Sequence, residues 1–167
     1  MANLIELAAL VGQVLQQRGL MLATAESCTG GGVAQAITEI AGSSEWFECG
    51  FVTYSNEAKM AMLKVPEEIL ARHGAVSYET AQAMAEGAIA NSRAKVALST
   101  TGIAGPGGGV PGKPVGMVCF GWAYGEQVHV DHVIFDGDRH AVREQSIEHA
   151  LQGLLNFLAA NAGTQTT

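Results

Sequence analysis

The sequence predicts a three-layer α/β/α sandwich, in which helices cover both faces of a mixed, mostly parallel sheet of about five strands, including one antiparallel strand. Two observations support this prediction. Short apolar runs alternate with amphipathic segments along most of the chain, an order typical of parallel strands connected by helices. Near the end of the chain, two apolar runs are separated only by Gly125 and Glu126, which is most simply a hairpin and makes one strand antiparallel.

The first third of the chain is expected to form a helix, a strand, a second helix and a second strand. Apolar residues recur at three- and four-residue spacing over 3–18, which indicates an amphipathic helix that ends at Gly19. The apolar run at 20–24 is then a short buried strand. The segment 30–41 reads as a helix, and 50–54 as the second strand.

The remaining two thirds continue the alternation. Asn56 is expected to cap a helix that follows the second strand at once, and Pro66 starts a further helical turn. Ser77 caps a long helix over 78–92, and 95–100 is the third strand. The last elements are a glycine- and proline-rich loop at 102–114, hairpin strands within 115–124 and 127–135, and a helix capped by Asp138.

The length and composition indicate one soluble domain, 1–167. Hydrophobic residues make up 48%, but no apolar run approaches the roughly 20 residues that a membrane helix needs. The N-terminus lacks the basic segment of a signal peptide, so we expect a cytoplasmic protein without a membrane partner. The three cysteines form no CxxC pair, which speaks against a disulfide framework and a thiolate zinc site. A net charge of −7 argues against nucleic acid as a partner.

Three polar segments begin where predicted strands end. They read TAESCTGGG at 24–32, YSNEAK at 54–59 and STTGIAGPGGG at 99–109. Ligands of open α/β sheets bind beyond the carboxyl ends of the strands. We therefore expect the three segments to line one crevice.

The glycine-rich loop contains two phosphate-binding patterns that fail in context. Residues 107–112 fit GxGxxG and 107–113 fit GxxxxGK, but both motifs need a helix N-terminus immediately afterwards. Pro114 and a strand follow instead. A flap over the crevice is the better interpretation of this loop.

The five histidines show no metal-binding spacing. His129 and His132 lie three apart on a predicted strand and face opposite sides, whereas His140 and His149 lie nine apart on a helix. Neither pair can chelate from one face. We therefore expect no metal site.

The segment TAESCTGGG allows three interpretations. It is an ordinary helix start, or it presents Cys28, since a thiol at a helix N-terminus is acidified, or it presents Ser27. Cys28 has no histidine partner at a neighbouring strand end. Lys59 offers a partner for Ser27, because a lysine in the first turn of a buried helix favours the neutral amine, which can act as a general base.

The ordered segments TAESCTGG, GFVTYSNEAK, HGAVS and STTGIAGPGGG followed by KPVG resemble the CinA C-terminal family. The resemblance spans nearly the whole chain, from about Leu7 to the last helix. It implies the same α/β/α fold and hydrolysis of a linear carboxamide, namely deamidation of nicotinamide mononucleotide to nicotinate mononucleotide and ammonia in pyridine nucleotide salvage. It further implies a homodimer and no metal or cofactor. The competing interpretation is a non-catalytic nucleotide-binding protein linked to competence or DNA damage.

The resemblance also assigns roles to single residues. It places the serine nucleophile at Ser27, the lysine base at Lys59, the family's tyrosine at Tyr54 and the hydroxyl before GIAGP at Thr101. An arginine of the last helix is expected in the site as well, Arg143 in first place and Arg139 as its rival. Backbone N–H groups at the start of the 30–41 helix are expected to stabilise the oxyanion. The residues expected to bind the substrate are Cys28, Thr29, Gly30, Gly31, Asn56, Gly102 and Arg143.

Overall fold

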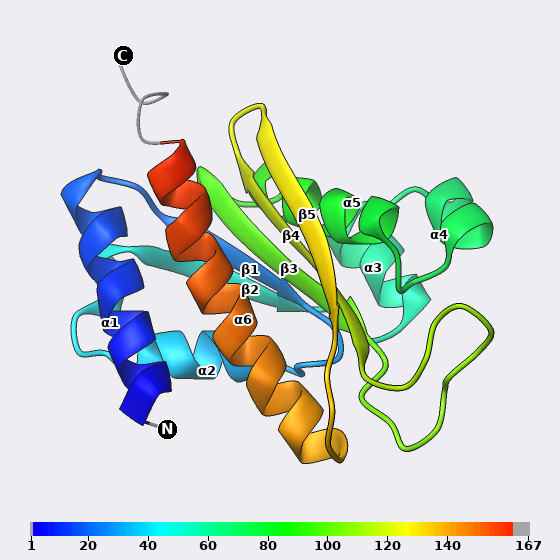
Figure 1. Cartoon of the computed structure of the whole chain (residues 1–167). Coiled ribbons are helices and arrows are strands. Elements are labelled where there is room, and N and C mark those ends of the chain that lie inside the picture. Colours follow the sequence, from blue (N-terminus) through cyan, green and yellow to red (C-terminus); the bar gives the residue numbers. More distant parts are fainter. Residues whose placement is uncertain (1, 162–167) are drawn as a thin grey trace.

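The computed structural model describes residues 2–161, with side chains from Leu4 onward, and is a three-layer α/β/α sandwich (Figure 1). Its five-stranded sheet has the order β2-β1-β3-β4-β5, and β4 runs in the direction opposite to the other four strands. The predicted fold class, including the hairpin that reverses one strand, is therefore confirmed. The strands are β1 (Leu22–Glu26), β2 (Phe47–Val52), β3 (Val96–Gly102), β4 (Met117–Tyr124) and β5 (Gln127–Ile134).

The helices divide between the two faces of the sheet (Figure 1). Helices α1 (Ala2–Gln17), α2 (Gly32–Thr38) and α6 (Arg139–Ala160) pack together on one face. Helices α3 (Asn56–Leu63), α4 (Glu67–His73) and α5 (Tyr78–Ala90) cover the other, and a 3₁₀ turn (Ser43–Glu45) precedes β2. No helix among residues 2–161 is both long and apolar enough to cross a membrane.

Each face of the sheet has its own apolar core. Phe120 and Trp122 of β4 pack under α6, where the Trp122 indole N–H donates to the Ala150 carbonyl at 3.1 Å. Gly153 makes this contact possible, because a Cβ there would lie 2.1 Å from the Trp122 ring. The second core, under α5, is smaller and rich in alanine.

Several predicted boundaries were wrong near the carboxyl end of the sheet. Strand β1 does not stop at residue 24 but runs to Glu26, because parallel pairing to β2 and β3 continues that far. Helix α2 does not begin at residue 30 but at Gly32, since Gly30 and Gly31 have left-handed φ angles of 61° and 100°. Strand β2 occupies Phe47–Val52 rather than 50–54.

The helix caps were predicted with one error. Ser77 and Asp138 cap α5 and α6 as expected, accepting backbone N–H groups at 3.1 and 2.9 Å. Helix α3 is capped by Ser55, whose hydroxyl accepts the Ala58 N–H at 3.0 Å, so Asn56 is its first helical residue rather than its cap. Lys59 still lies close to the start of α3, although one position further along than the sequence suggested.

Candidate active site

A cleft of about 230 Å³ opens at the carboxyl ends of β1, β2 and β3. The three polar segments singled out from the sequence all reach it, together with the α4–α5 connection and the first residue of α6. Most of the expected site residues therefore meet in one place, whereas Thr29, Gly30, Gly31 and Arg143 lie outside the lining. The lining residues are Ser27, Cys28, Tyr54, Asn56, Lys59, Ala75, Val76, Thr101, Gly102, Ala104 and Arg139.

Ser27 and Lys59 meet in the cleft. The Lys59 Nζ lies 3.2 Å from the Ser27 Oγ, although the two residues are 32 positions apart. Both are buried, Lys59 with only 1% of its surface exposed. The same Nζ lies 3.2 Å from the Thr53 carbonyl and 3.3 Å from the Tyr54 carbonyl, so the amine is held on three sides.

Burial lowers the pKa of Lys59 below that of an ordinary lysine. Within residues 2–161 its amine forms no ion pair with a carboxylate that would offset this effect. In its neutral form the amine would have two N–H donors for the Thr53 and Tyr54 carbonyls and one lone pair that could accept the Ser27 hydroxyl proton. The site therefore holds a serine hydroxyl in contact with a buried lysine amine.

Cys28 is not an activated thiol. Burial raises its pKa to about 12, and the nearby Glu26 carboxylate adds to the rise. The expectation that a helix N-terminus acidifies this thiol is wrong, because the N-terminus of α2 is already occupied by a carboxylate. Ser27 is left as the nucleophile that the geometry favours.

The occupying carboxylate belongs to Glu26, which the sequence analysis did not single out. Its side chain is fully buried at the end of β1 and accepts the N–H groups of Gly31, Val33 and Ala34 at 3.2, 2.9 and 2.9 Å. A glutamate directly before the serine and the glycines was the only signal available in the sequence.

The N–H groups that open α2 therefore do not point at a substrate. The expectation that they form the oxyanion site is wrong for Gly31, Val33 and Ala34, which donate to Glu26. The N–H groups of Gly30 and Gly32 donate to the carbonyls of Ser27 and Thr29 at 3.0 and 2.9 Å. We refer to residues 27–31 as the serine turn.

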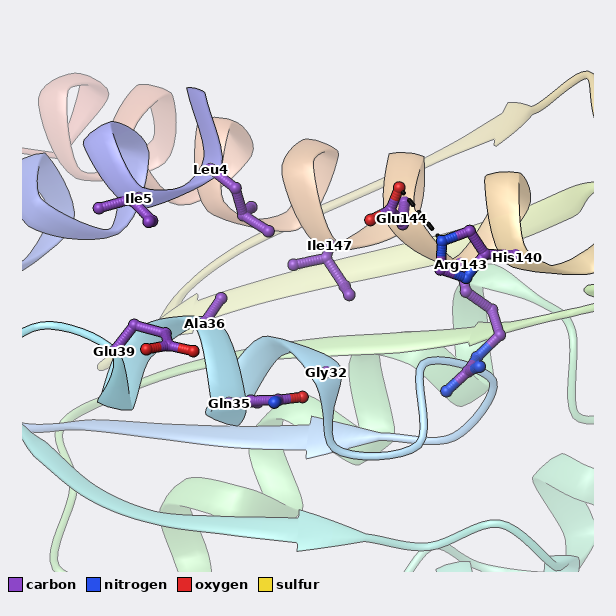
Figure 2. Close-up of a pocket in the computed structure, with 10 residues that line it drawn as sticks. All are labelled: Leu4, Ile5, Gly32, Gln35, Ala36, Glu39, His140, Arg143, Glu144 and Ile147. Carbon is purple, nitrogen blue, oxygen red and sulfur yellow. Dashed lines mark ion pairs between the residues drawn. The ribbon is translucent and has the colours of Figure 1, made fainter. Parts of the chain in front are cut away.

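The two arginines at the start of α6 have different partners. Arg139 lines the cleft, where its Nη1 donates to the Gly105 carbonyl at 2.7 Å and its Nη2 to the Tyr54 hydroxyl at 3.0 Å. Arg143 extends from α6 toward the loop that precedes Gly32 (Figure 2). It donates to the Cys28 and Thr29 carbonyls of the serine turn at 3.2 and 3.3 Å. It borders a separate cavity of about 270 Å³ between α1, α2 and α6. Neither arginine forms an ion pair with a carboxylate in the described part of the chain.

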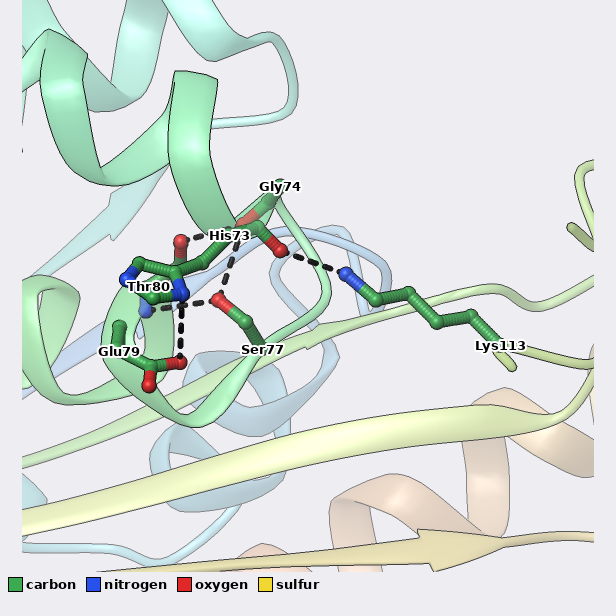
Figure 3. A network of polar contacts seen from close by, with 6 residues as sticks. All are labelled: His73, Gly74, Ser77, Glu79, Thr80 and Lys113. Atoms are coloured by element: carbon green, nitrogen blue, oxygen red, sulfur yellow. Dashed lines mark hydrogen bonds and ion pairs between the residues drawn. The ribbon is translucent and has the colours of Figure 1, made fainter. Parts of the chain in front are cut away.

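The wall of the cleft that includes Ala75 and Val76 is held through carbonyl groups. Figure 3 shows two of these carbonyls, those of His73 and Gly74, with the side chains that donate to them. Three successive carbonyls, those of residues 73–75, each accept a hydrogen bond from a side chain. The donors are Lys113 to His73 at 2.6 Å, Ser77 and Thr80 to Gly74 at 3.0 and 2.6 Å, and Thr101 to Ala75 at 2.8 Å. Lys113 belongs to the β3–β4 connection, residues 103–116, which we call the glycine flap. The wall is thus tied to both β3 and the glycine flap.

Comparisons with known proteins show which family the chain resembles over nearly its whole length. Residues 4–158 match the model of the family described as CinA C-terminal domain. The chain is 50% identical to the nicotinamide-nucleotide amidohydrolase PncC of Pseudomonas putida, over 90% of this chain and 94% of the relative. It is 55% identical to the protein of the same name from Escherichia coli K12, over 92% and 93%. The crystal structure of the competence/damage inducible protein CihA from Agrobacterium tumefaciens superposes with a TM-score of 0.90 at 45% identity, covering 93% of this chain and 95% of that one.

Proposed function

The chain belongs to the CinA C-terminal domain family, and we propose that it is a nicotinamide-nucleotide amidohydrolase that converts nicotinamide mononucleotide and water to nicotinate mononucleotide and ammonia. The names of the two relatives support the reaction. The observation that carries the mechanism is the contact of 3.2 Å between the Lys59 amine and the Ser27 hydroxyl at the buried end of the cleft.

The proposed reaction is acyl transfer in two steps. Neutral Lys59 takes the Ser27 proton while the Ser27 Oγ attacks the carboxamide carbon, and the proton then passes to the nitrogen that leaves as ammonia. Neutral Lys59 then takes a proton from water, whose oxygen attacks the ester carbon. The bond between that carbon and the Ser27 Oγ breaks, nicotinate mononucleotide leaves, and Lys59 returns the proton to the Ser27 oxygen. Each step begins with the lysine uncharged, which agrees with the lowered pKa that burial gives it.

The phosphate of the substrate is assigned to Arg139, the alternative that the sequence left open. Its guanidinium lines the cleft and has only neutral acceptors in the described chain, the Gly105 carbonyl and the Tyr54 hydroxyl. An arginine with neutral partners can take up a doubly charged phosphate without first losing an ion pair. The guanidinium of Arg143 instead binds the carbonyls of Cys28 and Thr29.

The second candidate is a protein that binds a nucleotide without hydrolysing it. Such a protein has no need of a buried lysine whose amine contacts a serine. The deciding experiment is an assay of ammonia released by the purified full-length chain from nicotinamide mononucleotide. We expect catalytic release, with nicotinate mononucleotide formed in equal amount. Saturable binding of the nucleotide without any ammonia would overturn the proposed function in favour of the binding protein.

We further propose that the protein acts as a homodimer in the cytoplasm and serves pyridine nucleotide salvage. These three statements rest on the family resemblance alone. Light scattering coupled to size exclusion measures the mass directly. A monomer at assay concentration would remove the dimer from the proposal.

A further inference from the structure

Glu26 places a carboxylate inside the protein without a cation beside it. Its exposed fraction is 0%, and within residues 2–161 it takes part in no ion pair. Burying an unpaired carboxylate is costly unless hydrogen-bond donors surround it. The chain therefore buries a carboxylate at an electrostatic cost directly before Ser27, the candidate nucleophile.

The donors around Glu26 come from the segment that follows Ser27. Its Oε1 accepts the Thr29 hydroxyl at 2.5 Å and the N–H groups of Gly31 and Val33, and its Oε2 accepts the N–H of Ala34. The Thr29 hydroxyl also lies 2.8 Å from the Thr100 hydroxyl on β3. One side chain thus fixes the serine turn to the start of α2 and, through Thr29, to the neighbouring strand.

This network determines which N–H groups remain for a ligand. From Ser27 to Ala34, all described backbone N–H groups except those of Cys28 and Thr29 donate to a carbonyl or to the Glu26 carboxylate. Cys28 directly follows the nucleophile and lines the cleft. In a serine acyl transfer, the N–H of the residue after the nucleophile is suitably placed to receive the oxyanion.

We propose that Glu26 is the positioning residue of this site: its carboxylate occupies the donors that open α2 and so fixes the serine turn with the Cys28 N–H group available to the oxyanion. The inference rests on the proposed amidohydrolase function. A positioning role for Glu26 explains why a carboxylate accepts the N–H groups at the start of this short helix, where an uncharged cap would be enough for helix stability. It also excludes the substrate phosphate from this helix start, since two anions would compete for the same donors.

The test compares Glu26→Gln with a control in the same helix, Ile37→Ala. Glutamine has the same shape, but its amide nitrogen would face the Ala34 N–H, donor against donor. Ile37 is fully buried in α2 and takes no part in the network, so its truncation weakens the helix without touching the turn. Ammonia release, KM, the thermal midpoint and the folded fraction are measured for both variants and for the wild type.

For a positioning residue, a small displacement of the reacting groups lowers kcat and leaves ground-state binding alone. We expect Glu26→Gln to lower kcat per folded molecule by about 10- to 100-fold with KM within about threefold of the wild type. We expect Ile37→Ala to lower the thermal midpoint while keeping kcat per folded molecule. A kcat of Glu26→Gln within twofold of the wild type, or an equal kcat loss in Ile37→Ala, would overturn the inference.

A second pair of variants decides the matter if Glu26→Gln does not fold. Thr29→Val removes the hydroxyl between Glu26 and Thr100 but keeps the shape, and we expect about a tenfold lower kcat. Thr29→Ser restores the hydroxyl and should recover most of that loss. An unchanged kcat in Thr29→Val would sink the inference. Because wild-type ammonia release is measured in the same series, a failed proposed function is told apart from a failed role for Glu26.

Discussion

The serine turn and the glycine flap are both glycine-rich, and both leave the carboxyl edge of the same sheet, yet the structure treats them in opposite ways. Residues 27–29 of the serine turn are buried, and three of the turn's N–H groups have fixed acceptors: Gly31 donates to Glu26, Gly30 to the Ser27 carbonyl and Ser27 to the Thr100 carbonyl of β3. Residues 106–112 of the glycine flap are exposed, and their backbone contact in the described chain is the short bridge between Val110 and Lys113. Glycine permits both conformations. A segment is fixed where neighbouring elements supply hydrogen-bond acceptors for its N–H groups.

The serine turn and the glycine flap suit two different functions at the cleft. A fixed segment suits a nucleophile, because the reacting atoms must be held within a fraction of an ångström. An exposed segment tied at its ends suits entry and retention of a ligand. Its ends are held by Arg139, at the Gly105 carbonyl, and by Lys113, at the His73 carbonyl. Variants in the serine turn should therefore act on kcat, and variants in the flap on KM.

The largest expected effect is that of Ser27→Ala. Removing the nucleophile abolishes the covalent route, so we expect kcat to fall by about 10⁴-fold or more while the nucleotide still binds. Cys28→Ala should cost far less, because the thiol with a pKa of about 12 stays protonated in the working range. Ammonia assays on both variants make the comparison. The reverse ranking would move the nucleophile to Cys28.

The second-largest effect on activity is expected at Lys59, whose amine contacts Ser27 of the serine turn. Only the neutral amine can take the serine proton, so kcat/KM should rise with pH through the pKa of Lys59 and then level off. Burial lowers that pKa, so the plateau should begin below the range of an ordinary lysine. Lys59→Met should lose about 10²- to 10⁴-fold in kcat.

A matched variant separates a base from an anchor for the phosphate. Lys59→Arg keeps the positive charge but cannot deprotonate at ordinary pH. We expect it to be as inactive as Lys59→Met while still binding nicotinamide mononucleotide in a calorimetric titration. Retention of most of the wild-type kcat in Lys59→Arg would show that another group activates Ser27.

A smaller effect distinguishes the two arginines. Arg139→Met should raise KM by about tenfold, since it removes a charged contact at the cleft and one tie of the flap. Arg143→Met should instead lower kcat, because Arg143 holds the Cys28 and Thr29 carbonyls of the serine turn. Steady-state kinetics at several substrate concentrations resolve the two parameters. Exchanged effects would restore Arg143 as the phosphate ligand.

The smallest effect is expected at Lys113, which anchors one end of the glycine flap through its hydrogen bond to the His73 carbonyl. Lys113→Met removes the donor to the His73 carbonyl, and we expect KM to rise by roughly threefold with kcat nearly unchanged. Arg93→Met is the control, because Arg93 is an exposed cation that pairs with Glu48 at 3.5 Å, away from the cleft lining. A loss in kcat for Lys113→Met would mean that the flap, like the serine turn, positions reacting groups.

Much of the fold could be predicted because its signals are local. The alternation of apolar runs with amphipathic segments, the two-residue connection before Gln127, and the caps Ser77 and Asp138 depend on residues close together in the chain. Two of the predictions that failed are the end of β1, which is Glu26, and the cap of α3, which is Ser55. Both positions lie where a strand passes into a turn, and there the tertiary pairing of strands sets the boundary. The sequence pattern alone could not measure how far that pairing extends.

The sequence by itself determined the layers of the fold and brought Ser27 and Lys59 forward as candidates. Only the tertiary structure decided their surroundings: the contact between them, and the carboxylate of Glu26 across the start of α2. Arg139 and Arg143 are four residues apart on one helix face, so periodicity treats them alike. The tertiary structure gives them different partners, because folding brings within about 3 Å acceptors that lie far away in the sequence.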